Sequence, residues 1–224
     1  MEKKEHYRGN LPHFQKPGQW YFITCVLAGA MPKNTISKYS QKLETVARIY
    51  KYLWTNDPNG KKFMIARRDY FIALEKYRRA FESVLHNSDT AEIKLSKENN
   101  RQQIEKALWF WDGKRLKSHA WCIMPNHLHW VVSLFEKNEK GEPVYLQDIL
   151  HSVKLYTARR INDNEGRKGR LWTHESFDTT IRNNRHFIKV VNYTKNNPVA
   201  SGLVNNWKEW KGTYVEPDLK VCFL

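Results

Sequence analysis

The sequence has few cysteines, and their placement excludes two classes of small protein. Cys25, Cys122 and Cys222 are odd in number and widely spaced, and no two of them form a CxxC pair. A disulfide framework needs paired cysteines, and a cysteine-based zinc site needs closely spaced ones. We therefore predict that the three are small buried side chains of a protein in a reduced compartment.

Long apolar runs are also missing. No stretch approaches the roughly 20 apolar residues that a membrane-spanning helix needs. The start of the chain, MEKKEHYRGN, carries charge but no apolar segment, so we expect no signal peptide. A sustained amphipathic helix with a basic face, which would suit a membrane surface, is not present either. We expect a cytoplasmic protein with no membrane partner.

Acidic residues are the third shortage. The 23 Asp and Glu are outnumbered by 38 Lys and Arg, which gives a formal charge of +15 and a pI near 9.7. Such a surplus favours a polyanionic partner. Nine Trp, eleven Tyr and ten Phe add flat rings on which nucleic-acid bases stack. The composition predicts a folded nucleic-acid-binding protein, with a basic protein of another role as the alternative.

The order of the apolar patterns indicates an α+β fold with an antiparallel sheet, because strands and helices do not alternate strictly. β-branched and aromatic runs predict strands at 20–27, 115–124, 128–135 and 177–181. Helical spacing predicts helices at 37–54, 70–85, 93–111, 146–161 and 184–196. The last helix should stop near Pro198, because the residue before a proline avoids helical geometry. After Trp207 we expect irregular structure.

The first motif whose side chains could bind a metal ion is His127-Leu128-His129. On a strand, residues two apart project to the same face, so both imidazoles would point at one place. Two ring nitrogens so placed can bind one divalent ion. An isolated HxH is also compatible with two ordinary polar residues on the solvated face of a strand.

The second motif pairs Tyr193 with Asn197 near the end of the last predicted helix. Residues four apart share one face of a helix. The Asn197 carbonyl would add an oxygen ligand to the two imidazoles, and Tyr193 would lie near a phosphate held by the metal. The alternatives are a packing aromatic for Tyr193 and a helix-ending residue for Asn197.

Four segments occur together and in order: 21–24 (YFIT), 120–129 (AWCIMPNHLH), 171–178 (LWTHESFD) and 193–203 (YTKNNPVASGL). In this combination the chain resembles the REP-associated tyrosine transposases, relatives of the single-tyrosine HUH transposases of small bacterial insertion sequences. The resemblance covers roughly 20–203 and is weakest in the helical region. The MPNHLH segment followed by the late NPV is far more specific than HxH alone.

The resemblance implies one HUH transposase-like domain over 1–224, with a helical insertion at about 37–111. Its core would be a ferredoxin-like α+β fold, a central antiparallel sheet flanked by helices. It also implies that Tyr193 is the nucleophile and that His127, His129 and Asn197 bind Mg²⁺ or Mn²⁺. The expected activity is nicking and rejoining of single-stranded DNA beside a palindromic hairpin, by a monomer or homodimer through a 5′-phosphotyrosine.

Tyr156 is a second candidate nucleophile, on a basic predicted helix. The residue four positions on is Arg160, which has no lone pair for a metal. Basic residues that would position DNA are Arg159, Arg160, Arg167, Lys168, Arg170, Arg182 and Arg185. Trp121 and Trp172 are candidates for base stacking, although burial is the commoner role of tryptophan. Two other functions stay open: a hairpin-binding protein whose site has lapsed, and a metal-dependent nuclease that uses water.

Overall fold

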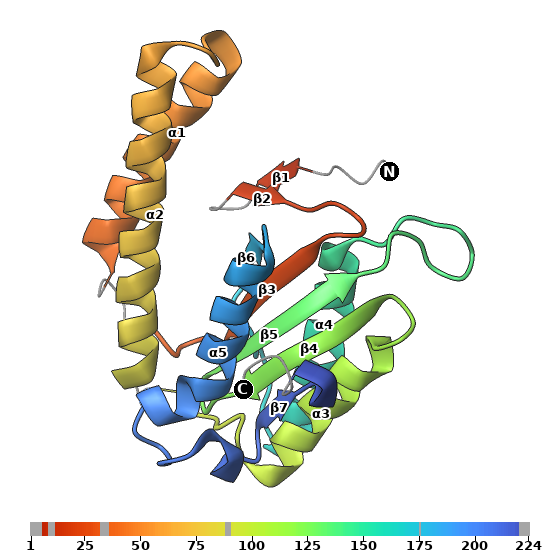
Figure 1. Cartoon of the computed structure of the whole chain (residues 1–224). Helices are drawn as coiled ribbons and strands as arrows, with labels where there is room; N and C mark the ends of the chain where they lie inside the picture. Colours follow the sequence, from red (N-terminus) through yellow and green to blue (C-terminus); the bar gives the residue numbers. More distant parts are fainter. Residues whose placement is uncertain (1–5, 9–11, 32–35, 88–90, 175, 220–224) are drawn as a thin grey trace. The chain divides into compact units, whose positions relative to one another are not determined.

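A computed structural model of the chain describes residues 6–8, 12–31, 36–87, 91–174 and 176–219 (Figure 1). Cys222 lies outside the described residues. The chain divides into two compact units. The sheet unit consists of Met1–Gly29 and Ala91–Leu224, and the helical unit is Ala30–Thr90.

A five-stranded antiparallel sheet is the centre of the sheet unit. Its strands lie in the order β6-β3-β5-β4-β7, and each pairs antiparallel with its neighbours. Their bounds are β3 (Trp20–Val26), β4 (Leu116–Ile123), β5 (His127–Leu134), β6 (Phe177–Thr180) and β7 (Thr213–Val215). Strand β5 is the central strand of the sheet, hydrogen-bonded to β3 on one side and to β4 on the other.

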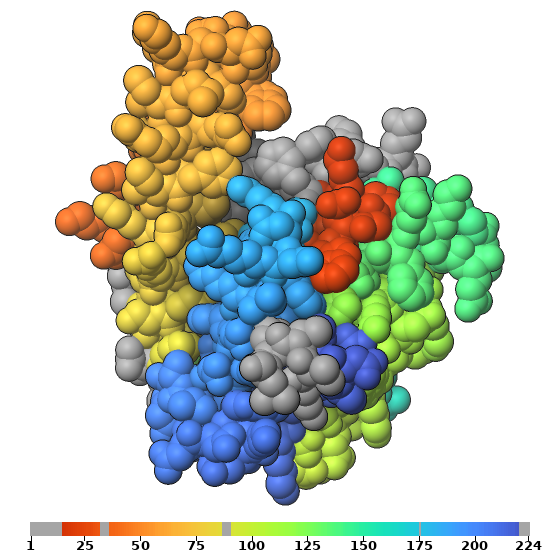
Figure 2. Space-filling view, viewed as in Figure 1, coloured from red at the N-terminus to blue at the C-terminus, as the bar shows by residue number. Residues whose placement is uncertain are grey.

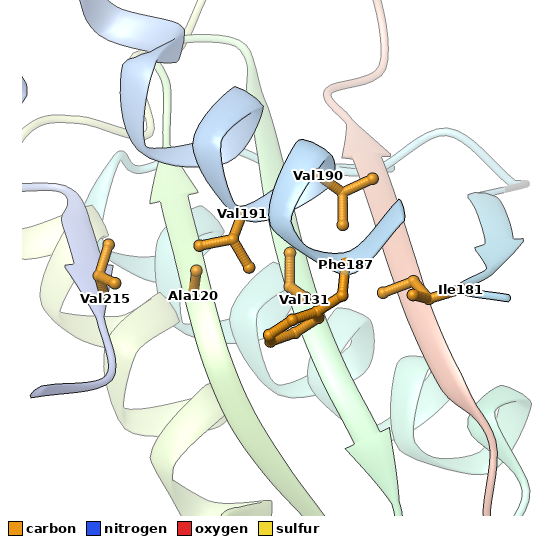
Figure 3. Close-up of a cluster of buried hydrophobic side chains, with 7 residues drawn as sticks. All are labelled: Ala120, Val131, Ile181, Phe187, Val190, Val191 and Val215. Atoms are coloured by element: carbon orange, nitrogen blue, oxygen red, sulfur yellow. The ribbon is translucent and has the colours of Figure 1, made fainter. Parts of the chain in front are cut away.

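The described part of the sheet unit also contains the α-helices α3 (Glu98–Trp111), α4 (Leu146–Asn164) and α5 (Asn184–Ala200) and the short 3-10 helix η1 (Trp207–Glu209). The succession β3-α3-β4-β5-α4-β6, with spatial order β6-β3-β5-β4, is the ferredoxin-like arrangement. In the close-up of Figure 3, α5 crosses one face of the sheet and other helices lie behind it. A separate two-stranded sheet joins β1 (His6–Arg8) to β2 (Pro12–Phe14). The predicted α+β class with a central antiparallel sheet is confirmed.

Alternation along β5 gives each face of the sheet its own packing. Trp130 is fully buried on the face of α3 and α4, whereas Val131 points to α5. The α5 layer is an apolar cluster that Figure 3 displays, formed by Ala120, Val131, Ile181, Phe187, Val190, Val191 and Val215. This cluster fixes α5 on the sheet because burying each large apolar side chain contributes about 1.5–3 kcal/mol. The outer side of α5 forms part of the molecular surface (Figure 2).

Helix α5 does not stop before Pro198, as the sequence suggested; it continues to Ala200. A proline in the last turn removes only one backbone hydrogen bond, so the helix tolerates it there. The helix ends at Ala200, and two residues later Gly202 has a φ of 68°, which is easy for glycine. The amides of Gly202 and Leu203 donate to the carbonyls of Val199 and Pro198, both at 2.9 Å.

Two further predictions from the sequence were wrong, one about the start of the helix expected at 93–111 and one about the segment after Trp207. Residues 93–97 are not helical, and the amide of Leu95 donates instead to the carbonyl of Pro125 at 2.8 Å. The segment after Trp207 is not wholly irregular, because β7 pairs with β4 at the sheet edge. A three-residue strand is too short to show a period in the sequence.

The helical unit is a hairpin of α1 (Ser37–Asn56) and α2 (Lys61–Asn87). Helix α2 begins earlier than predicted, because no glycine or proline interrupts it. Its aromatic core includes Tyr50, whose ring stacks on Tyr70 at 5.0 Å and on Phe63 at 5.6 Å. The range expected for an insertion, 37–111, spans both units, since α3 belongs to the sheet unit and packs on α4. None of the described helices combines the length and apolar character needed to cross a bilayer.

Candidate active site

His127 and His129 lie side by side on the central strand β5. Both side chains are on the α5 face of the sheet, and both residues are fully buried. Their ring centroids are 4.7 Å apart and their planes meet at 74°. The two imidazoles are therefore not polar residues of a solvated strand face.

Each imidazole is oriented through its Nδ1 atom. The Nδ1–H of His127 donates to Asn126 Oδ1 at 2.7 Å, because a carbonyl oxygen can only accept. In the neutral ring of His127 the ligand lone pair is therefore on Nε2. Nδ1 of His129 lies 2.9 Å from the hydroxyl of Thr24 on β3. Such oxygen partners fix the ring orientation of metal-binding histidines.

Tyr193 reaches the histidine pair from α5. Its ring centroid is 5.2 Å from that of His129, at an interplanar angle of 69°. Phe22 on β3 contacts both rings, stacking on His129 at 5.3 Å and meeting Tyr193 edge-on at 5.8 Å. Tyr193 is half-buried, so its ring is held by packing but is not enclosed. The structure thus brings together a phenol and an imidazole from distant parts of the sequence.

Asn197 lies one helical turn after Tyr193 and is 1% exposed. Among the described residues, neither its side-chain oxygen nor its side-chain nitrogen has a hydrogen-bond partner. An unsatisfied buried amide costs about 1–3 kcal/mol, so a residue of this kind fits a role toward a ligand. Its backbone carbonyl is occupied, accepting from the amide of Ser201 at 3.0 Å and from the Ser201 hydroxyl at 2.9 Å.

The donor set fits a divalent metal ion. Two imidazoles and one amide oxygen form a mixed nitrogen and oxygen set, which can hold a divalent ion when water supplies further ligands. A ligand bond from either imidazole would come from Nε2, since Nδ1 is engaged. The buried Asn197 amide is the observation that favours an ion over a purely structural histidine pair.

Sequence reasoning did not identify the residues that orient the site. Phe22 and Thr24 belong to the YFIT segment, but only the strand register shows that Thr24 lies opposite His129. Asn126 immediately precedes His127, so its role could have been inferred from the sequence. The register between distant strands could not, because alternation fixes the face on which a residue lies and not its partner on the next strand.

The structure does not bring Tyr156 to the histidine pair. This residue is on α4, which packs with α3 on the opposite face of the sheet from α5. Its hydroxyl donates to Gln103 Oε1 at 3.2 Å, and the Arg160 guanidinium lies 5.7 Å from its ring centroid. Trp121 and Trp172 are both buried, and the indole of Trp172 donates to Thr157 Oγ1 at 2.8 Å, so neither offers a free stacking face.

The predicted basic cluster is divided between elements. Arg159 and Arg160 are exposed on α4, while Arg182 precedes α5 and Arg185 lies in its first turn. The remaining members, Arg167, Lys168 and Arg170, lie in the loop that follows α4. Five of the seven cations are therefore associated with α4 and two with α5.

No protein-family model matches this chain, and no curated protein sequence matches it either. Among solved structures, the chain is similar to a REP-associated tyrosine transposase bound to a REP hairpin. The two share 15% sequence identity with a TM-score of 0.45, over 92% of this chain and 80% of the transposase chain.

Proposed function

We propose that this protein nicks and rejoins single-stranded DNA beside a hairpin, with Tyr193 as the nucleophile. The observation that carries the proposal is the contact of the Tyr193 ring with His129, one turn from the buried amide of Asn197. Four sequence segments occur in the same order as in the REP-associated tyrosine transposases, and this resemblance supports the same chemistry. It also makes a hairpin the expected feature of the DNA.

His127 and His129, through Nε2, and Asn197, through its side-chain oxygen, would hold Mg²⁺ or Mn²⁺. When bound, this ion would act as a Lewis acid that polarises the scissile phosphate. The protein side of the site is preorganised for that role, since Asn126 and Thr24 fix the two rings.

The tyrosine step conserves the energy of the phosphodiester. A free phenol has a pKa of about 10 and must lose its proton to attack phosphorus. A bond forms between the Tyr193 oxygen and phosphorus, and the bond to the 3′ oxygen breaks, so that a 3′-hydroxyl leaves after taking up a proton. A second 3′-hydroxyl then attacks the 5′-phosphotyrosine, and the strand is sealed without ATP.

Adduct formation tests the proposal directly. The substrate is a DNA hairpin with single-stranded flanks, labelled at its 3′ end because tyrosine keeps the 5′ phosphate of the downstream fragment. With Mn²⁺ we expect a labelled protein band on a denaturing gel. Tyr193→Phe should abolish this band, whereas the matched variant Tyr156→Phe should retain it.

The same gel separates the alternatives. Binding without cleavage by the unaltered chain would indicate a hairpin-binding protein whose site has lapsed. Cleavage that persists in Tyr193→Phe without any adduct would indicate a nuclease that uses water. An adduct that persists in Tyr193→Phe and disappears in Tyr156→Phe would show that Tyr156 on α4 is the nucleophile. His127→Ala should abolish cleavage and leave most hairpin binding intact.

A further inference from the structure

The end of α3 carries large aromatic side chains on the protein surface, away from the candidate active site. Phe110 is 55% exposed and Trp109 is 44% exposed. Helix α3 packs with α4, on the sheet face opposite α5. Adjacent exposed aromatics of this size are typical of an interaction site. We call this surface the α3 patch, formed by Lys106, Trp109, Phe110, Trp111, Lys114 and Arg115.

Packing beneath the patch holds its rings in place. Trp109 meets the buried Trp121 edge-on at 4.7 Å and Tyr214 at 4.9 Å. Trp121 and Tyr214 in turn stack on each other at 4.2 Å. Trp109 is therefore anchored on one side while almost half of it stays exposed. A preordered ring loses little conformational entropy when a partner stacks on it.

Cations surround these rings. Lys114 Nζ lies 4.0 Å from the centroid of Phe110, and Arg115 lies 4.8 Å from that of Trp111. Lys106 is exposed one helical turn before Phe110, on the same face of α3. The nearby carboxylate of Asp112 is engaged, since it accepts a hydrogen bond from the Ser118 amide at 2.6 Å. The positive charge of the patch is concentrated around Phe110, since the carboxylates of Asp112, Glu216 and Asp218 act on Tyr214 beneath Trp109.

We propose that the α3 patch binds an unpaired DNA strand, with bases stacked on Trp109 and Phe110 and phosphates near Lys106 and Lys114. Alternating rings and cations fit single-stranded nucleic acid, which offers base faces and phosphates together. Duplex DNA does not fit, because its base faces are already stacked inside the helix. An apolar protein partner would leave the cations without complementary charge. The choice of DNA as the nucleic acid rests on the proposed function.

Binding can be measured without any cleavage, in full-length protein that carries Tyr193→Phe. The probe is a fluorescent oligothymidine, which has no hairpin. Phe110→Ala should weaken its binding about 5- to 150-fold, the range expected for loss of one stacked base. Trp54→Ala is the matched control, because Trp54 is 58% exposed on α1 and lies outside the patch; it should leave the affinity unchanged.

Salt dependence tests the proposed phosphate contacts. Replacing Lys106 and Lys114 by alanine should lower the slope of log affinity against log salt by about 0.7 for each lost contact. Equal affinities of Phe110→Ala and Trp54→Ala for oligothymidine would overturn the proposal. The proposal would also be overturned if Phe110→Ala weakened binding of a blunt hairpin by the same factor as binding of oligothymidine. A Phe110→Ala variant that binds oligothymidine normally but has a changed oligomeric state would overturn it as well. Loss of adduct formation by Tyr193→Phe is a separate result, so the two proposals can fail independently.

Discussion

Loss of the Thr24 hydroxyl should slow the proposed reaction of Tyr193 with DNA. It lies 2.9 Å from Nδ1 of His129, and both residues are buried. Thr24→Val keeps the side-chain volume but removes this contact. We predict a fall of about 10- to 100-fold in the rate of adduct formation, the usual effect of losing an oxygen partner of a metal-binding histidine. Time courses at several Mn²⁺ concentrations measure it.

Thr180→Val on β6 is the control for this substitution, because it places the same change on a neighbouring strand without a bond to His129. An unchanged rate in Thr24→Val would show that the orientation of His129 does not depend on the hydroxyl.

His119 forms a second buried histidine site with a different role. Its Nδ1 is 2.9 Å from Glu216 Oε2 and its Nε2 is 2.9 Å from Ser133 Oγ. Burial lowers the pKa of His119 below 6.5, against the opposite influence of Glu216. Burial acts to raise the pKa of Glu216, yet hydrogen bonds from Lys117 and His119 hold it below 4.5.

Both folded-state pKa values are lower than the unfolded ones, so the unfolded chain binds more protons as the pH falls. The stability that these groups contribute at neutral pH is therefore lost in acid, first below about 6.5 through His119 and then below about 4.5 through Glu216. Urea unfolding across this range should show the loss. His119→Gln should flatten the upper part of the curve, and an unchanged pH profile would contradict this assignment.

The two cysteines of the described residues should be chemically inert in the folded protein. Burial raises the pKa of Cys122 to about 12 and also raises that of Cys25. Since the thiolate is the reactive form, neither should react with a disulfide reagent at neutral pH. In a Cys222→Ser chain we expect no titratable thiol before unfolding and two after it. A thiol titrated in the native state would contradict the burial of these strands.

At the scale of the elements, α5 depends on Phe187 for its place on the sheet. This side chain is 7% exposed and meets Trp20 at 4.8 Å and His119 at 5.2 Å. Phe187→Ala should lower the free energy of unfolding by about 3–5 kcal/mol. Adduct formation should fall as well, because α5 also carries Tyr193 and Asn197.

Ile188 supplies the comparison, since it is the next residue of α5 and is 39% exposed. Ile188→Ala should change the free energy of unfolding by no more than about 0.5 kcal/mol. Equal losses in the two variants, measured in urea, would mean that the apolar cluster is not what fixes the helix.

The sequence predicted these elements to different degrees for physical reasons. Long strands and helices have a period that repeats, so β3, β5 and α4 were identified within a few residues. The three-residue β7 has no period, and its pairing with β4 comes from tertiary packing. Pro198 was read as a stop because local geometry disfavours it, yet a last turn tolerates one missing amide.

The candidate site was predicted through motifs, and its surroundings were not. His127 and His129 share a face because a strand alternates, which is local information. The approach of Tyr193 to His129 came from the family resemblance, since nothing local sets the distance between β5 and α5. The basic residues were grouped by closeness in sequence, whereas the fold divides them between α4, the loop that follows it and the start of α5.

For the molecule as a whole, the two places where the sheet unit is interrupted, after Gly29 and before Ala91, lie near one turn of that unit. The amide of Leu27 donates to the carbonyl of Asn126 at 3.0 Å, and that of Leu95 to the carbonyl of Pro125 at 2.8 Å. The two chain ends are therefore close enough for a short Gly-Ser linker. We predict that a chain lacking 30–90 still unfolds cooperatively, which circular dichroism during heating would measure.

The sheet unit has a core of its own, which is the reason for this expectation. An intact chain with the linker inserted after Thr90 is the control for the linker itself. Aggregation or non-cooperative unfolding of the shortened chain alone would show that the sheet unit needs the helical unit to fold.

The central position of β5 has a consequence for partly open states of the protein. Its amides are bonded to strands on both sides, so their deuterium exchange should require disruption of the sheet. Helix α5 rests on one face only and should exchange sooner. In mild denaturant the imidazole pair should therefore stay in place after α5 has moved away, and Tyr193 and Asn197 should leave it together because both lie on α5.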